Sequence, residues 1–193
     1  SKDIEDNNFT IEMETGTGKT YVYLRSILEL NKEYGFTKFI IVVPTVAIRT
    51  GVEKSIKMLK EHFKILYGID VEKHRFVYDS KNIKSISTKL VESTDLSICI
   101  MNIQAFNKDS NKIRQEDEYG QIIWRDIQMI RPIVIIDEPQ KIEGDGKKKS
   151  QSLKAIEELE PLFTLRYSAT HKKLYNQIYK LDSFDAFEKD LVK

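Results

Sequence analysis

The stretch FTIEMETGTGKTYVYLRSILEL, residues 9–30, joins an extended apolar run to a glycine-rich turn and then to a helical pattern. Glycines let the backbone turn tightly and bring its N–H groups close to phosphate oxygens. A helix beginning near Lys19 would add the positive end of its dipole, the Lys19 ammonium would reach the β- and γ-phosphates, and the Thr20 hydroxyl would ligate Mg²⁺. The predicted phosphate-binding loop consists of Thr15, Gly16, Thr17, Gly18, Lys19 and Thr20.

One position departs from the usual phosphate-loop pattern. G-x-x-x-x-G-K-[ST] asks for glycine at position 13, where this chain has Met13. The alternative is a glycine-rich surface turn without a ligand. The apolar run before the glycines and the helical pattern after them favour the phosphate loop.

A pair of carboxylates supplies what a phosphate loop needs as a partner. In PIVIIDEPQ, residues 132–140, an apolar run ends in Asp137 and Glu138. Ligands of open parallel sheets bind beyond the carboxyl ends of the strands, so Asp137 is expected beside Thr20. Asp137 would hold Mg²⁺, through water, and Glu138 would orient and deprotonate the attacking water. By itself, an acidic pair at a strand end could equally cap a helix or face solvent.

The composition is that of an ordinary globular chain. The 193 residues are 40% hydrophobic and 32% charged, with a formal net charge of +1, so any basic surface must be local. The single cysteine, Cys99, lies in the apolar run LSICIM and is interpreted as a core residue rather than a catalytic thiol. The three histidines show no metal-ligand spacing. No apolar run approaches roughly 18 residues and no signal peptide is seen, which predicts a cytoplasmic protein without a membrane span.

Apolar β-branched runs alternate with helical patterns along the chain. The expected strands are residues 9–13, 38–44, 74–78, 96–102, 132–137 and 163–169, and the expected helices are 19–34, 46–63, 83–91, 122–130, 150–159 and a segment from 172 onward. This alternation predicts an α/β domain with a mostly parallel sheet between helices. The polar segment 107–120 is expected to be a mobile loop. For the lysines at 147–149, a solvated loop is favoured over a contact with a phosphate backbone.

A third motif follows the last predicted strand. LRYSATHK, residues 165–172, places Ser168, Thr170 and His171 at a strand end. Small hydroxyl side chains there can link an active site to a neighbouring element through short hydrogen bonds. His171 is a candidate reporter of the phosphate state. Capping of a helix by Ser168 or Thr170 is an alternative that can coexist with this role.

Taken in order, TGTGKT, DEPQ and SAT resemble the motifs of superfamily 2 helicases and translocases. DEPQ, together with IIVVPTVAIRTGV (40–52) and MNIQAFNKD (101–109), resembles the Res subunit of type III restriction-modification enzymes. The resemblance extends from Phe9 to about Lys193. It implies a RecA-like P-loop NTPase fold, with residues 1–193 as a single domain, the first motor domain of a longer chain. The second RecA-like domain and the nuclease domain would lie elsewhere in that chain.

The resemblance also implies roles for particular residues. ATP with Mg²⁺ would be the cofactors, with Lys19, Asp137 and Glu138 catalytic. Residues Gln140, Ser168, Thr170 and His171 would couple hydrolysis to domain movement, and the DNA track would include Pro44, Thr45, Arg49, Asn102, Gln104 and Phe106. For Phe106, packing in the core is an equally weighted alternative.

The implied partners are double-stranded DNA, a modification (methyltransferase) subunit and the second RecA-like domain in cis. Because an arginine finger from that second domain can contribute ~10³–10⁵ in rate, the isolated chain is expected to bind nucleotide, hydrolyse it very slowly and not cut DNA. Two other functions remain open at this point. One is another superfamily 2 motor, such as a type I restriction subunit, and the other is a nucleotide switch without translocation.

Overall fold

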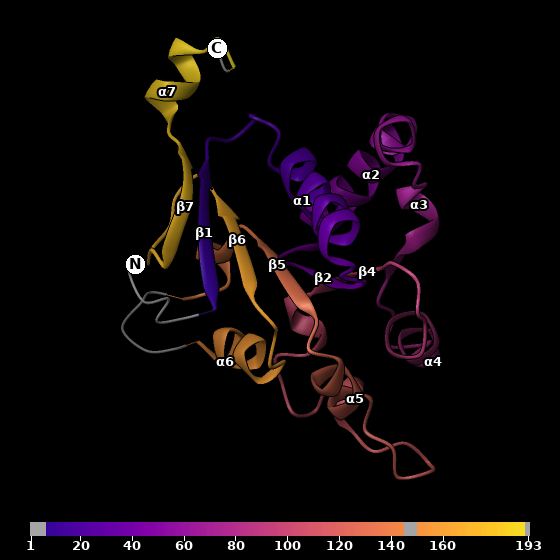
Figure 1. Cartoon of the computed structure of the whole chain (residues 1–193). Helices are drawn as coiled ribbons and strands as arrows, with labels where there is room; N and C mark the ends of the chain where they lie inside the picture. Colours follow the sequence, from indigo (N-terminus) through magenta and orange to yellow (C-terminus); the bar gives the residue numbers. More distant parts are fainter. Residues whose placement is uncertain (1–6, 145–149, 192–193) are drawn as a thin grey trace.

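A single parallel sheet organises the molecule. The computed structural model describes residues 7–144 and 150–191. In this part of the chain the strands are β1 (Asn8–Met13), β2 (Lys38–Val43), β3 (Arg75–Val77), β4 (Ser97–Asn102), β5 (Ile133–Asp137), β6 (Thr164–Ser168) and β7 (Asn176–Leu181). Their order is β3-β4-β2-β5-β6-β1-β7, and every pair is parallel (Figure 1). The predicted α/β class with a parallel sheet is confirmed.

Helices cover both faces of this sheet. One face carries α1 (Lys19–Tyr34), α2 (Val46–Tyr67) and α3 (Val71–His74), whereas the other carries α4 (Lys84–Ile86) with a π-helical turn (Ser87–Val91), α5 (Ile123–Ile130) and α6 (Gln151–Glu158). Short 3₁₀ turns span Ile103–Ala105, Lys112–Arg114 and Pro139–Lys141, and α7 (Ser183–Glu188) follows β7. The two apolar clusters between sheet and helices make a three-layer domain.

The central strands show why the sequence has continuous apolar runs. Within β2, Phe39 and Ile41 join the apolar cluster under α1 and α2, and Ile40 and Val42 join the cluster on the other face. A parallel strand that is covered on both faces needs apolar residues at every position. Cys99 of β4 is fully buried and burial raises the pKa of its thiol, so its interpretation as a core residue is confirmed.

Glycines set the ends of the two long helices. Helix α1 ends at Gly35 and α2 at Gly68, each with a positive φ (73° and 70°) and with its backbone N–H bonded to a carbonyl of the last turn. Helix α2 therefore runs four residues past the expected end at Phe63. Thr45 caps its start, because Thr45 Oγ1 accepts a hydrogen bond from the Ile48 N–H at 3.2 Å.

The prediction of a helix from residue 172 is wrong for most of that segment. Residues 176–181 form β7, which pairs with β1, and only Ser183–Glu188 is helical. The Tyr175 N–H donates to Thr10 Oγ1 and the Glu14 N–H donates to the Leu181 carbonyl, so both ends of β7 are fixed to the strand that precedes the glycine-rich loop. Strand β1 is thereby paired on both edges.

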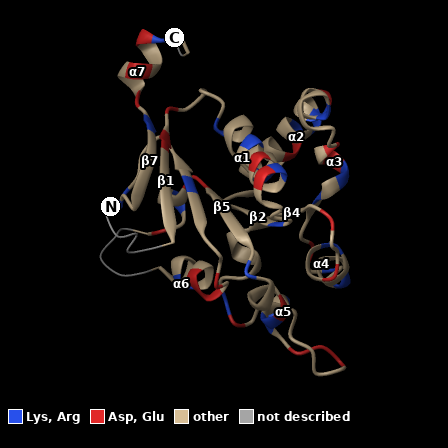
Figure 2. Cartoon of the chain, in the orientation of Figure 1, with Lys and Arg blue, Asp and Glu red and all other residues tan. Residues whose placement is uncertain are grey.

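The polar segment 107–120, expected to be a mobile loop, is anchored to the rest of the fold by several contacts. Ile113 is fully buried, and the Arg114 guanidinium lies 4.0 Å from the centre of the Trp124 ring. The lysines at 147–149 lie outside the described residues. Charged residues lie mainly on the helices and loops, with both signs on α2 and α3 (Figure 2). No helix in the described part of the chain is long and apolar enough to cross a membrane.

Candidate functional site

The glycine-rich loop adopts a conformation that its glycines make possible. Gly16 and Gly18 have φ angles of 84° and 90°, values that other residues rarely adopt. Met13, by contrast, is the last residue of β1 and is buried in the core. Its backbone is extended, so no glycine is required there, which accounts for the departure from the usual pattern.

The first turn of α1 faces this loop with open backbone N–H groups. Gly18 stands at the N-cap position, and no described side chain caps the helix. Unpaired N–H groups and the helix dipole together favour an anion at this place. Lys19 Nζ lies 3.3 Å from the Met13 carbonyl oxygen and 3.3 Å from Glu138 Oε1.

Asp137 ends β5 and Glu138 follows it directly, and the two have different surroundings. Asp137 is buried, and burial, with a further contribution from the Glu138 charge, raises the pKa of its carboxyl to about 6. Glu138 has a φ of 57°, a left-handed conformation that is strained in a residue other than glycine. Its carboxylate lies between Lys19 on one side and the Gln140 amide, which donates to it, on the other.

These two groups of residues share one cavity. A hollow of about 490 Å³ is lined by the glycine-rich loop, by Lys19 and Thr20, by Asp137 and Glu138, and by side chains of α2. The sequence predicted that these two pairs would converge, and the structure brings them together. In the described residues no group of three or more His, Cys, Asp or Glu side chains forms a ready metal site.

The predicted coupling residues form a chain of hydrogen bonds that begins at Glu138. Gln140 bonds Glu138 through its amide nitrogen and accepts from Ser168 Oγ through its amide oxygen, at 2.6 Å. Ser168 Oγ in turn accepts from the Thr170 backbone N–H at 3.1 Å. His171 is separate from this chain: its Nε2 lies 3.1 Å from the Ile11 carbonyl oxygen, and burial lowers its pKa.

Five of the six predicted DNA-track residues gather at the carboxyl ends of β2 and β4. Arg49 donates to Asn102 Oδ1 at 3.0 Å, and Gln104 Nε2 donates to the Pro44 carbonyl at 3.0 Å. Thr45, beside them, is exposed and caps α2.

Phe106 does not belong to this group. It is fully buried and stacks on Trp124 with 5.5 Å between ring centres. Phe106 is therefore corrected from a candidate DNA contact to a core residue, the alternative that the sequence left open.

Sequence reasoning missed two buried polar side chains. Tyr23, one helical turn after Thr20, is fully buried, and its i+3 spacing from Thr20 is the signal that could have drawn attention to it. Arg166 is buried in the middle of β6, forms an ion pair with Glu143 and donates to Asn8 at 2.9 Å. A charged residue inside an apolar strand was the available signal.

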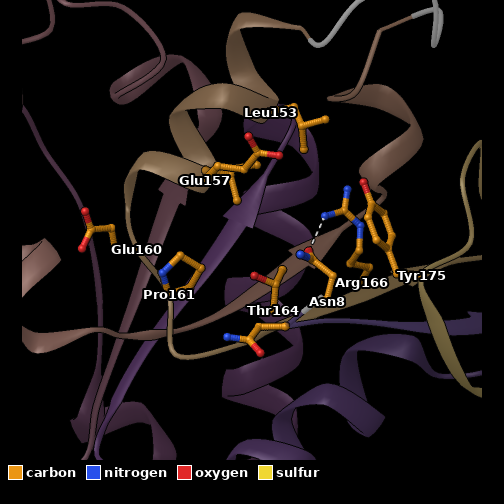
Figure 3. A pocket seen from close by; sticks show the side chains of 10 residues that line it. Asn8, Leu153, Glu157, Glu160, Pro161, Thr164, Arg166 and Tyr175 are labelled. Carbon is orange, nitrogen blue, oxygen red and sulfur yellow. Dashed lines mark hydrogen bonds between the residues drawn. The ribbon is translucent and has the colours of Figure 1, made fainter. Parts of the chain in front are cut away.

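Arg166 borders a second cavity, of about 400 Å³, shown in Figure 3. Asn8 and Thr164, the first residues of β1 and β6, line it. The second cavity therefore lies at the amino ends of these strands, whereas Lys19 and Asp137 lie beyond or at the carboxyl ends of β1 and β5. Its Arg166 guanidinium is already engaged with Asn8, Glu143 and the Tyr175 ring. The cavity lined by Lys19, Thr20, Asp137 and Glu138 is therefore the stronger candidate for the functional site.

The family model described as "Type III restriction enzyme, res subunit" matches residues 2–173. The chain belongs to this family. Among curated Res subunits, it is 34% identical to that of the type III restriction-modification enzyme EcoPI from Escherichia phage P1, over 99% of this chain. It is also 34% identical to the EcoP15I Res subunit of Escherichia coli, over 98% of this chain. It spans about a fifth of the length of these Res subunits, 21% in each case.

Two solved structures share the fold of this Res-family chain. The Sulfolobus solfataricus SWI2/SNF2 ATPase core, in a complex with double-stranded DNA, matches 84% of the chain and 27% of its own length, with a TM-score of 0.54 and 16% identity. A nuclease-deletion mutant of the type ISP restriction-modification enzyme LlaGI, bound to a DNA substrate mimic, matches 97% of the chain and 19% of its own length, with a TM-score of 0.55 and 15% identity. The fold is thus a RecA-like α/β fold.

Proposed function

We propose that this chain is the first RecA-like motor domain of a Res subunit, which binds ATP with Mg²⁺ and hydrolyses it to drive translocation along double-stranded DNA before cleavage. The observation that supports the proposal most directly is the shared cavity of Lys19, Thr20, Asp137 and Glu138. Two of these residues come from the start of α1 and two from the end of β5, as a phosphate loop with its carboxylate partner requires.

The oxygen groups present suit Mg²⁺. The Thr20 hydroxyl and the Asp137 carboxylate are hard oxygen donors of the kind that Mg²⁺ prefers, so these two residues would hold the ion. With its pKa at about 6, Asp137 is mostly ionised at neutral pH and able to serve as a ligand. When bound, Mg²⁺ would supply the positive charge that offsets the charge developing on the phosphates.

The contacts of Lys19 and Glu138 indicate how they would act on ATP. Lys19 holds Glu138 at 3.3 Å, and a β- or γ-phosphate would be a stronger partner for its ammonium. Release of the pair leaves Glu138 free to accept a proton from the attacking water. The hydrogen bonds from Glu138 through Gln140 to Ser168 connect a change at Glu138 to β6. We assign these hydrogen-bonded residues, with Thr170 and His171, to the coupling of hydrolysis to domain movement.

The DNA track is proposed along the carboxyl ends of β2 and β4. Arg49, Asn102, Gln104 and Thr45 offer charged and polar groups that can grip phosphates without reading sequence. Pro44 is buried, and its carbonyl accepts a hydrogen bond from Gln104, so its part in the track is to shape the corner before Thr45. Both solved structures named above are complexes with DNA or a DNA mimic, which supports DNA as a ligand of this fold. By analogy with Res subunits, we also propose two partners, a second RecA-like domain in cis and a modification subunit. The proposed location is the cytoplasm, where the protein has access to DNA.

The binding step is testable on this chain. Lys19→Ala should reduce affinity for Mg²⁺–ATP at least tenfold, because it removes the phosphate-binding ammonium, whereas Glu138→Gln should keep binding. Lys32→Ala, at the other end of α1, is the matched control and should bind as the wild type does. Isothermal titration of each variant measures the effect. Equal affinity of the Lys19→Ala and Lys32→Ala variants would contradict the proposed site.

The hydrolysis step is tested in a longer Res subunit that contains this domain. There, Glu138→Gln should bind ATP but lose turnover, since the amide cannot take up the proton. Normal turnover would remove Glu138 from its assigned role as the base.

A further inference from the structure

The fully buried hydroxyl of Tyr23 lies beside Thr20 and Asp137, two residues that line the proposed nucleotide cavity. Its side chain is fully buried, and Tyr23 Oη has no partner of normal hydrogen-bond geometry among the described residues. Burial and then the negative charge of Asp137 raise its pKa well above the ordinary value, and its hydroxyl faces the Thr20 and Asp137 side chains. Thr20 and Asp137, the two predicted Mg²⁺ ligands, are thus the polar side chains next to the Tyr23 hydroxyl.

A buried hydroxyl without a hydrogen-bond partner of normal geometry is unfavourable. Leaving such a group unpaired costs about 1–3 kcal/mol, so phenylalanine would serve the core better if packing were the only requirement. The neighbouring Tyr167 shows the usual solution. Its ring packs edge-on against Tyr23 with 5.5 Å between centres, and its hydroxyl is paired with Ser26 Oγ at 3.1 Å.

The ring of Tyr23 is held in place by this packing and by its position on α1. Because Tyr23 follows Thr20 by one helical turn, both side chains lie on the side of α1 that meets the end of β5. The Asp137 carboxylate is near enough to the hydroxyl for each group to shift the pKa of the other. A ligating carboxylate is commonly oriented by such a neighbouring donor.

We propose that Tyr23 is a positioning residue that donates a hydrogen bond to Asp137 when this carboxylate engages Mg²⁺–nucleotide, and so fixes the orientation of the metal ligand. This inference rests on the proposed function of the same site. It adds a residue that contacts neither the phosphates nor the metal and acts through Asp137. The Asp137 carboxylate then supplies the partner of normal hydrogen-bond geometry that the hydroxyl otherwise lacks.

The test compares Tyr23→Phe with Tyr167→Phe, the same change in the adjacent ring. Binding of ATP is measured by titration at increasing MgCl₂ and, separately, in EDTA. Tyr23→Phe should raise the Mg²⁺ concentration needed for half-maximal ATP affinity by about 10–100-fold, the usual effect of losing a partner that orients a metal ligand. Its affinity for ATP in EDTA should be unchanged. Tyr167→Phe should show the wild-type Mg²⁺ dependence, since Ser26 keeps its bond to the Val22 carbonyl.

A second readout separates positioning from a structural role. Without ligand, Tyr23→Phe should melt at the wild-type temperature or above it, because it removes an unpaired buried hydroxyl. A lower melting temperature, or an unchanged Mg²⁺ dependence, would overturn the proposal. If ATP binding instead proves insensitive to Lys19→Ala, the proposed function itself fails, whatever the result for Tyr23.

Discussion

At the scale of single residues, Arg166 shows how a buried charge can link two motifs. It lies in β6 two residues before Ser168, and its partner Glu143 lies five residues after Glu138. The ion pair therefore ties the segment that carries Ser168, the serine proposed for coupling, to the segment that carries the acidic pair. Asn8 and the Tyr175 ring, 4.5 Å from the guanidinium, extend this contact to β1 and to the start of β7.

Arg166→Met should cost about 3–5 kcal/mol of stability, because it leaves the buried Glu143 carboxylate without its countercharge. The double variant Arg166→Met, Glu143→Leu should recover much of this loss, since it removes both charges. Urea denaturation of the two single variants and the double variant gives the coupling energy. Losses that simply add would show that the two side chains do not stabilise one another.

The sequence revealed the chemistry of the site better than its supporting contacts. Lys19, Thr20, Asp137 and Glu138 were found because each follows a strand signal with a residue type that phosphate or metal binding requires. Tyr23 and Arg166 carried weaker local signals, a spacing on one helix and a charge within an apolar strand. Their importance depends on which residues the fold places beside them. Phe106 illustrates the same limit: an aromatic residue in a motif can serve the core or a ligand, and burial decides between them.

At the scale of elements, the start of α2 combines a structural and a proposed functional role in one residue. Thr45 Oγ1 caps the helix, and the same residue lies exposed among the proposed DNA contacts. A loss of DNA affinity on mutation could therefore reflect damage to the helix. Substitutions that keep the cap but change the charge separate the two roles.

Thr45→Ala should lower stability by about 1 kcal/mol through loss of the cap. Thr45→Asp should keep the cap and the stability but weaken DNA binding, because it places a carboxylate where a DNA phosphate would lie. Thr45→Ser is the control for both effects. Thermal unfolding and binding to a random-sequence duplex at two salt concentrations measure them. Wild-type binding should fall with salt. No DNA binding by the wild type in any nucleotide state would favour the nucleotide switch over the motor.

Helices and central strands could be predicted from local pattern, but the edge of the sheet could not. The apolar runs of β2, β4 and β5 and the glycines that end α1 and α2 act within a few residues of the elements they specify. Residues 176–181 read NQIYKL, with most side chains exposed, and little in that pattern distinguishes an edge strand from a polar helix. Its identity as β7 follows from the free edge of β1, which lies about 165 positions away along the chain.

At the scale of the whole molecule, β7 determines whether the strand leading into the glycine-rich loop is internal or at an edge. The family match ends at residue 173, before β7 begins, yet β7 contributes the second set of backbone partners for β1. Without it, Phe9 to Met13 would present unpaired N–H and C=O groups to solvent. Helix α7, by contrast, stands away from the sheet in Figure 1, and its Phe184 and Phe187 side chains are exposed.

Removal of residues 174–193 should therefore destabilise the domain far more than removal of 183–193. With about 1 kcal/mol for each strand hydrogen bond lost, the longer truncation should cost roughly 2–5 kcal/mol, promote aggregation through the exposed β1 edge and weaken Mg²⁺–ATP binding. The shorter truncation keeps the Glu14–Leu181 hydrogen bond next to the glycine-rich loop, so its ATP affinity should match the full chain. Urea denaturation, light scattering and ATP titration of both truncated chains compare these outcomes. If the chain ending at residue 173 were as stable and bound ATP as tightly as the full chain, β7 would have no part in holding the nucleotide site.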